Sequence, residues 1–192
     1  MERPVWIKCL VYGRIPRPLN LVVRCTKLPY SCATCGKEHD ELPGVAFRWP
    51  DPYFDVSESE RSSRIVATTD LCAIDDEDFF IRGVILIPIR GESDYLGIGV
   101  WVSQKRENFR TYRDNYDAPN IGPFFGWLCN RLPFYERDTW ALKTMAHFQG
   151  ANSRPLVTIE PSDHPLYLDY SEGLTIDRAW ELAHAHSGAV RA

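Results

Sequence analysis

The segment that begins at Cys32 carries side chains that can bind a metal ion. Cys32-Ala-Thr-Cys35-Gly36 separates two cysteines by two residues, so that both thiolates can reach one ion. Gly36 tolerates the positive φ of a tight turn and lets backbone N–H groups approach the sulfurs. His39 adds a third ligand of a type that zinc prefers. The sequence therefore predicts a zinc site at Cys32, Cys35 and His39.

A fourth ligand has to come from a distant part of the chain, because the sequence contains no second Cys-x-x-Cys. Two residues are the candidates, Cys72 after Asp70-Leu71 and His164 after Ser162-Asp163. Cys25 is nearer, but it lies in an N-terminal segment that we expect to fall outside the domain. The predicted metal ligands are therefore Cys32, Cys35, His39, Cys72 and His164.

Two other interpretations of the Cys-x-x-Cys remain open. A redox pair of the thioredoxin type expects a strand before the first cysteine and a helix that begins there. Gly36 and Pro43 make a long helix after Cys32 improbable. Alternatively, both cysteines are buried thiols without a chemical role. A disulfide framework is not expected, because the N-terminus does not resemble a secretory signal.

Other polar groups have weaker claims to chemistry. Asp163 precedes His164 and could orient its imidazole, although we favour a turn in which Asp163 bonds local backbone and His164 packs. Glu60, Arg61 and Arg64 are expected on a solvated helix, and the acidic run 75–78 in a solvated loop. His184-x-His186 is not expected to bind metal as a pair, because residues two apart on a helix do not share a face.

These side chains need a scaffold, and the sequence predicts one that is rich in strands. Runs of β-branched and aromatic residues predict an antiparallel hairpin, 79–89 paired with 95–103, around a turn at 91–94. Gly97 and Gly99 within it indicate a bulge or the close approach of another backbone. Further strands are predicted at 45–49, 124–130, 140–148 and 155–160, and helices at 57–66, 104–112 and 175–186. We expect an α+β domain with an antiparallel or mixed central sheet, a few flanking helices and an N-terminal metal-knuckle-like turn.

Composition sets the domain organisation and the class of protein. The chain has 192 residues, of which 44% are hydrophobic, enough for one core of ordinary size. Residues 1–31 contain six basic residues and one acidic residue, which predicts an N-terminal extension at 1–30, a domain at 31–187 and a tail at 188–192. A net charge of −4 argues against a nucleic-acid partner, and no run is apolar enough to cross a membrane. We expect a cytoplasmic protein.

A series of short motifs resembles a bacterial family known only as a domain of unknown function. The resemblance extends from about Cys32 to about Ala185 and implies a domain that begins just before the knuckle. It implies a free-standing cytoplasmic protein, implies no activity, and modestly favours Cys72 and His164 as ligands. The motifs are Cys32-x-x-Cys35-Gly36-x-x-His39, Leu42-Pro43, Pro50-Asp51-x-Tyr53, Glu60-Arg61, Asp70-Leu71-Cys72, Phe80-Ile81-Arg82-Gly83, Gly99–Ser103, Asn108-Phe109, Phe125–Leu128, Asn130–Pro133, Arg154-Pro155 and Asp163–Leu166.

Two classes of function follow. The first is a non-catalytic binding or interaction module for a protein or small-molecule ligand, with a structural zinc knuckle. The second is a zinc-dependent hydrolase in which water occupies an open metal position and Asp163 or Glu60 carries protons. The number of protein ligands distinguishes them, because a closed four-ligand site is structural. Substrate, partner and oligomeric state have no signal in the sequence.

Overall fold

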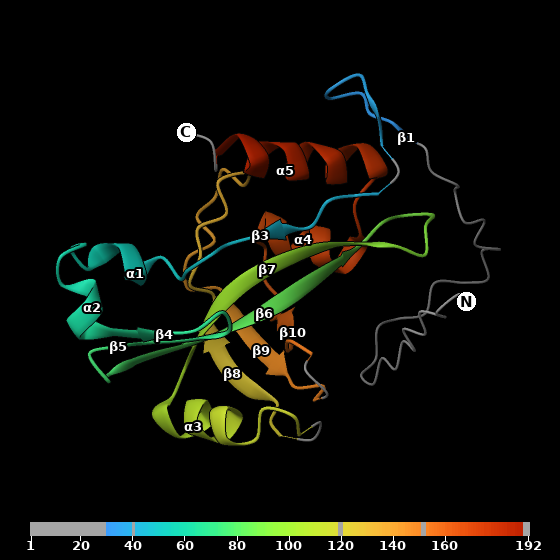
Figure 1. The fold of residues 1–192 in the computed structure, drawn as a ribbon. Helices are drawn as coiled ribbons and strands as arrows, with labels where there is room; N and C mark the ends of the chain where they lie inside the picture. Colours follow the sequence, from blue (N-terminus) through green and yellow to red (C-terminus); the bar gives the residue numbers. More distant parts are fainter. Residues whose placement is uncertain (1–29, 40, 119–120, 151–152, 190–192) are drawn as a thin grey trace, which may run out of the picture.

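The structure is a computed structural model that describes residues 30–39, 41–118, 121–150 and 153–189 (Figure 1). The N-terminal extension predicted at 1–30 therefore lies outside the described residues, except for Tyr30. The strands are β1 (Tyr30–Ser31), β2 (Glu38–His39), β3 (Val45–Ala46), β4 (Ile65–Ala67), β5 (Leu71–Ile74), β6 (Asp78–Pro88), β7 (Tyr95–Gln104), β8 (Phe124–Trp127), β9 (Lys143–His147) and β10 (Leu156–Ile159). The helices are α1 (Pro52–Asp55), α2 (Arg61–Arg64), α3 (Arg106–Asp114), α4 (Pro165–Glu172) and α5 (Ile176–Ala189).

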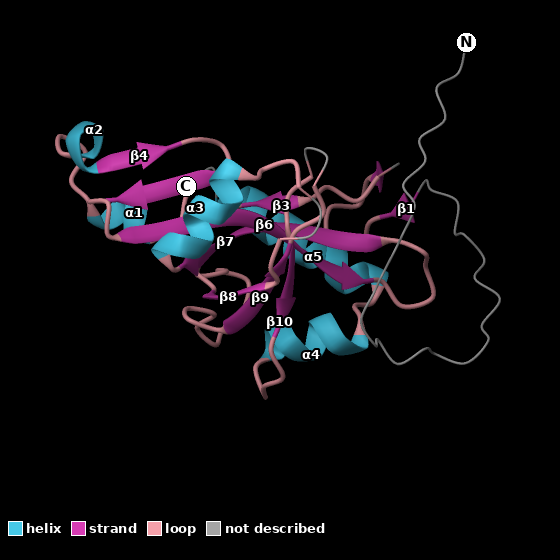
Figure 2. Ribbon diagram, turned by 90° about the horizontal axis from the view of Figure 1, so that it is seen from below, coloured by secondary structure: helices cyan, strands magenta, loops and turns pink. Residues whose placement is uncertain are grey.

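The described strands form a mixed eight-stranded sheet and a separate two-stranded hairpin, as the α+β prediction required. The main path through the large sheet is β3-β7-β6-β10-β9-β8, and β4 and β5 extend it beside the first half of β6. β3 runs parallel to β7 and β10 parallel to β6, whereas the other pairs are antiparallel. β10 runs across the direction of β6 and β7 in Figure 2, and β8 and β9 do so in Figure 1.

The hairpin of β6 and β7 forms the centre of the large sheet. Its strands lie where the β-branched pattern predicts them. Ten residue pairs join the two strands, from Phe79 opposite Gln104 to Pro88 opposite Tyr95. Alternate residues of β6, among them Ile85 and Ile87, are fully buried in the main core. Leu166 of α4 and Leu182 of α5 belong to the same core, so these two helices are packed on the hairpin.

Gly99 marks the close approach of a second backbone, as predicted. β3 pairs with β7 so that Ala46 lies opposite Gly99. A Cβ atom at Gly99 would lie 3.3 Å from the Cβ atom of Ala46, tighter than ordinary van der Waals contact. The glycine therefore lets β3 join the sheet edge, which carries the chain onward from the knuckle.

Two local predictions require correction. The helix expected at 57–66 is a single turn, α2, which begins at Arg61, and the chain continues directly into β4. Ser57 does not cap this helix, because its hydroxyl donates to the carboxylate of Glu60 instead of accepting from the backbone. No helix was predicted at 165–172, whereas α4 begins there with Pro165 in its first turn.

The sheet curls back on itself after β8, and Gly126 makes this possible. A bridge joins Leu128 to Val102 of β7, and the Cys129 amide donates to the Trp101 carbonyl oxygen. A Cβ atom at Gly126 would overlap the carbonyl oxygen of Ser103 in β7. A side chain at this position would therefore push β8 away from β7.

Gly126→Ala is expected to lower the free energy of unfolding by about 1–3 kcal/mol, the usual cost of forcing extra atoms into a packed site. Urea denaturation would measure the change. Gly97→Ala is the matched control, because a Cβ atom there would meet Val84 and Leu86 at 3.8 and 3.9 Å, which is ordinary contact. Equal stability of the two variants would contradict the proposed role of Gly126.

Among the described helices, none combines the length and hydropathy that crossing a bilayer requires. α5, the longest of them, runs to Ala189, and the residues after it lie outside the described structure. We call the turn between β1 and β2, with its two cysteines, the knuckle. Figure 1 shows α5 beside β3 and the knuckle, with α3 at the opposite side of the molecule. The predicted metal site therefore lies where the start of the described chain meets its last helix.

Candidate metal centre

The two cysteines lie in a tight turn between β1 and β2. The strands pair in an antiparallel register with Ser31 opposite Glu38, so the turn is closed immediately before Cys32. Within it the Cys32 amide donates to the Lys37 carbonyl oxygen at 2.9 Å, and the Gly36 amide to the Cys32 carbonyl oxygen at 2.8 Å. Gly36 has φ of 68°, the left-handed conformation expected of it. The turn holds both thiols on one side.

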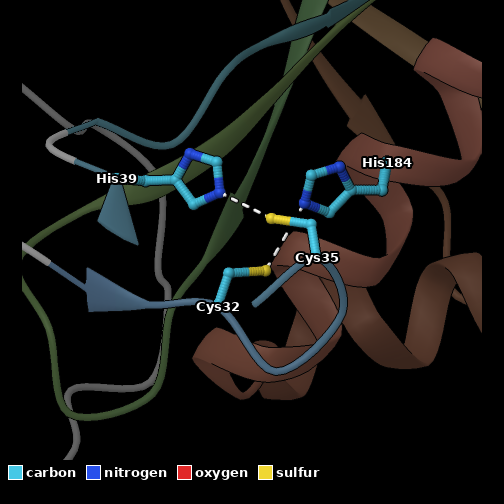
Figure 3. A group of neighbouring side chains, drawn as sticks. All are labelled: Cys32, Cys35, His39 and His184. Carbon is cyan, nitrogen blue, oxygen red and sulfur yellow. Dashed lines mark hydrogen bonds between the residues drawn. The ribbon is translucent and has the colours of Figure 1, made fainter. Parts of the chain in front are cut away.

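His39 follows the turn on β2 and points back toward it (Figure 3). Its Nε2 atom lies 3.0 Å from the Sγ atom of Cys35. The imidazole stacks on the indole of Trp180, with ring centroids 4.1 Å apart and an angle of 26° between the planes. Since Trp180 is 1% exposed and belongs to α5, this contact fixes the imidazole against the last helix.

His184 comes from α5 and completes the group. Its Nε2 atom lies 3.4 Å from the Sγ atom of Cys32, although 152 positions separate the two residues. Trp180 lies one helical turn earlier, and its ring is 5.7 Å from that of His184. Residues four apart share a helix face, so α5 presents a tryptophan and a histidine together to the knuckle.

Four ligand atoms thus converge from both ends of the described chain (Figure 3). One atom each from Cys32, Cys35, His39 and His184 lie within 4.8 Å of one another. A tetrahedral zinc ion with two sulfur and two nitrogen ligands separates its ligand atoms by about 3.3–3.8 Å, given bonds of about 2.0–2.3 Å. The separation of 3.0 Å between His39 Nε2 and Cys35 Sγ is shorter than this and the upper limit of 4.8 Å is longer, so the group has the dimensions of such a site.

The surroundings of Cys32 favour its thiolate, the form that binds metal. Burial alone would raise the pKa of this thiol. Hydrogen bonds from the Cys35 amide, the His184 side chain and the Thr34 amide outweigh burial and lower the pKa from 9.0 to about 7. A thiol that ionises near neutral pH loses its proton to a metal at little cost.

Cys72, predicted as a possible ligand, does not lie in this group. It occupies the middle of β5 and is fully buried in a second apolar cluster with Val56, Phe80 and Trp101. Burial raises the pKa of its thiol to about 12, which opposes ionisation. Cys72 is therefore a packing residue of β5.

His164, the other predicted ligand, also lies elsewhere, and both of its ring nitrogens are occupied. Its Nδ1 atom accepts a hydrogen bond from the Leu166 amide at 3.0 Å and so caps α4, while Nε2 donates to the Arg137 carbonyl oxygen at 3.2 Å. Asp163 pairs with the Arg137 guanidinium at 3.0 Å instead of orienting the imidazole. His164 packs in the interior, as expected, whereas Asp163 pairs with an arginine 26 residues away and not only with local backbone.

His184 is the residue that sequence reasoning missed. It was weighed only as a pair with His186, and the two histidines do separate: the ring of His186 packs edge-on against Phe47 at 5.1 Å. A single histidine on an amphipathic helix is a weak signal on its own. The spacing of Trp180 and His184 by one turn was available in the sequence, but nothing local shows that α5 returns to the knuckle.

Comparison with known proteins places the chain in a family without revealing an activity. Its residues 31–174 match the family described as "uncharacterized protein conserved in bacteria (DUF2199)", and the chain belongs to that family. No curated protein and no solved structure matches the chain. The matched segment contains Cys32, Cys35 and His39 but ends before α5, so His184 lies beyond it.

Proposed function

We propose that this protein is a non-catalytic binding domain in which a structural zinc ion joins the N-terminal knuckle to the last helix. The supporting observation is the convergence of ligand atoms from Cys32, Cys35, His39 and His184 within 4.8 Å of one another. Two thiolates and two imidazoles are the ligands of many structural zinc sites. Bound zinc would tie α5 to the turn and so stabilise the surface that binds a protein or small-molecule partner.

A structural role suits this ligand set better than a catalytic one. Four protein ligands fill a tetrahedral zinc ion and leave no position for an attacking water. The carboxylates considered as proton carriers are engaged elsewhere, Glu60 with Ser57 and Arg64 and Asp163 with Arg137. No observation on the described residues favours the alternative of a zinc-dependent hydrolase.

Zinc is the metal we propose, and the cytoplasm is the compartment. Paired thiolates and imidazoles in a compact group suit zinc better than the hard cations, which prefer oxygen ligands. Cys32, Cys35, Cys72 and Cys129 are all free thiols, and such a set persists most readily in a reducing compartment.

Metal analysis of the purified, tag-free protein by mass spectrometry tests the proposal. We expect about one zinc per chain in the wild type and near-complete loss in Cys32→Ser and His184→Ala. His186→Ala and His164→Ala serve as controls, because both histidines are half-buried or buried but lie outside the group. Full zinc retention in His184→Ala would contradict the four-ligand site, and absence of metal from the wild type would end the zinc proposal.

A further inference from the structure

A cleft of about 450 Å³ opens on the sheet and includes none of the four metal-centre residues. It lies between the turn before β5, strands β6 and β10, and the chain just after α3. Its walls combine apolar and polar side chains, namely Asp70, Val84, Leu86, Tyr116, Gln149, Ser153, Arg154 and Leu156. The volume is sufficient for a small organic molecule.

The floor of the cleft is apolar. Val84 and Leu86 lie two residues apart on β6, so they share one face of the sheet, and Leu156 of β10 pairs directly with Val84. All three side chains are only half-buried in the described structure. A hydrocarbon group placed on them would remove apolar surface from water, which favours binding.

The rim carries an ordered carboxylate and guanidinium pair. Arg154 Nε donates to Asp70 Oδ1 at 2.6 Å, and the Tyr116 hydroxyl donates to Asp70 Oδ2 at 3.2 Å. Burial would raise the pKa of Asp70, but the hydrogen bonds from Arg154, Thr69 and Tyr116 outweigh it and lower the pKa. Asp70 is therefore ionised and holds the Arg154 guanidinium at the edge of the cleft.

A second guanidinium near this pair has no anion of its own. Arg82 lies on the same face of β6 as Val84, and its Nε atom is buried without a hydrogen-bond partner among the described residues. Burial, and then the charge of Arg154, lower the pKa of Arg82, and only Asp70 opposes them. The Arg82 amide donates to the Asp70 carbonyl oxygen at 2.9 Å, and Arg82 Nη1 donates to the Thr69 carbonyl oxygen at 3.5 Å, so this guanidinium lies beside the turn that forms one wall of the cleft. No ion pair joins it to a carboxylate among the described residues, and burial of a cation without a counter-ion is costly.

We propose that this cleft binds a small amphiphilic oxyanion, a carboxylate or a phosphate monoester with a short hydrocarbon body. The oxyanion would accept hydrogen bonds from Arg154, which lines the cleft, and from Arg82, which lies at its edge two residues before Val84 on β6. The hydrocarbon body would cover Val84, Leu86 and Leu156. Planar guanidinium donors suit both kinds of oxyanion. The proposal rests on the proposed role as a binding module and names its ligand class, but it does not depend on the zinc site.

Methyl NMR of the full-length, metal-analysed protein, with hexanoate, hexyl phosphate and hexanol as probes, tests the assignment. We expect saturable shifts at the methyl groups of Val84, Leu86 and Leu156 with at least one oxyanion, and none with hexanol at the same concentrations. Tighter binding of hexanoate would identify a carboxylate ligand, and tighter binding of hexyl phosphate would identify a phosphate ester. Equal affinity would support the shared oxyanion chemistry.

Variants separate the charge from the shape of the cleft. Arg82→Met should weaken oxyanion binding at least about tenfold, whereas Arg82→Lys should recover part of it. Leu86→Trp should abolish binding by filling the floor while both arginines remain. Arg137→Met is the control, because Arg137 pairs with Asp163 outside the cleft. Each variant is compared only after its methyl spectrum shows the native fold.

Three results would overturn the proposal: hexanol shifts as large as those of the oxyanions, an affinity unchanged in Arg82→Met, or no saturable shift with either oxyanion. The zinc content of the same samples distinguishes this failure from failure of the structural zinc site. Zinc-loaded protein that binds neither oxyanion would remove the cleft assignment alone. Metal-free, folded protein that binds hexanoate at the cleft would remove the zinc site alone.

Discussion

Removal of the proposed zinc ion is expected to detach α5 from the knuckle and to lower the free energy of unfolding by several kcal/mol. A ligand that binds only the folded state stabilises it by about 4 kcal/mol when its free concentration is about a thousand times Kd. Structural zinc sites bind tightly enough to reach that range. Urea denaturation with and without a chelator would measure the difference.

The loss of stability should appear first in the region near the metal and only then in the whole domain. The reason is that α5 is attached both to the main core and to the knuckle. Ala179 and Leu182 anchor it in the main core, whereas His184 and Trp180 face the knuckle. Without metal, the stack of His39 on Trp180 and the contact of Cys32 with His184 still join α5 to the knuckle, but no coordination bond holds them together. Amide hydrogen exchange should therefore rise first in residues 32–39 and in the second half of α5, while β6 and β7 stay protected.

His184→Ala provides the decisive control for this result. Its stability in zinc should match that of the chelated wild type, and chelator should change it no further. His186→Ala should respond to chelator as the wild type does, because His186 contacts Phe47 and not the knuckle. A chelator-induced loss of the same size in His184→Ala would show that the stabilising metal is bound elsewhere.

The elements that sequence reasoning located correctly are those with strong local signals. The β6–β7 hairpin has long β-branched runs around a glycine turn, and α5 has a clear apolar stripe. The knuckle has two cysteines and a glycine whose chemistry is local. Short elements were misplaced, because a single turn such as α2 depends on its neighbours: the Arg64 guanidinium bonds Asp75, eleven residues later.

The fourth ligand, His184, could not be predicted from local sequence patterns. Cys72 and His164 have residue types and motifs that suit zinc, but Cys72 packs in the second apolar cluster and His164 caps α4. His184 is brought to Cys32 by the path of the whole chain through the sheet. That path depends on long-range pairings such as β3 beside β7 and β10 beside β6, which no local pattern encodes.

Asn130→Ala is expected to be the most destabilising single substitution of a polar side chain outside the metal centre. Asn130 is fully buried, and its side chain joins three segments. Its Oδ1 atom accepts from the Trp101 amide of β7 at 2.8 Å, and its Nδ2 atom donates to the Trp49 carbonyl oxygen at 2.9 Å and to Asp51 Oδ1 at 3.2 Å. Alanine would leave the amide of the fully buried Trp101 without its partner and would also remove the bonds to Trp49 and Asp51.

Each buried polar group left unsatisfied costs about 1–3 kcal/mol, so we expect a loss of about 3–5 kcal/mol in urea denaturation. Asn115→Ala is the matched control: Asn115 is exposed at the end of α3, donates only to Thr111, and should cost less than about 1 kcal/mol. Asn130→Asp separates the two directions of bonding, because a carboxylate still accepts from Trp101 but cannot donate to Trp49 and would repel Asp51. If Asn130→Ala were no less stable than Asn115→Ala, the link between β7 and the chain after β8 would have to come from backbone pairing alone.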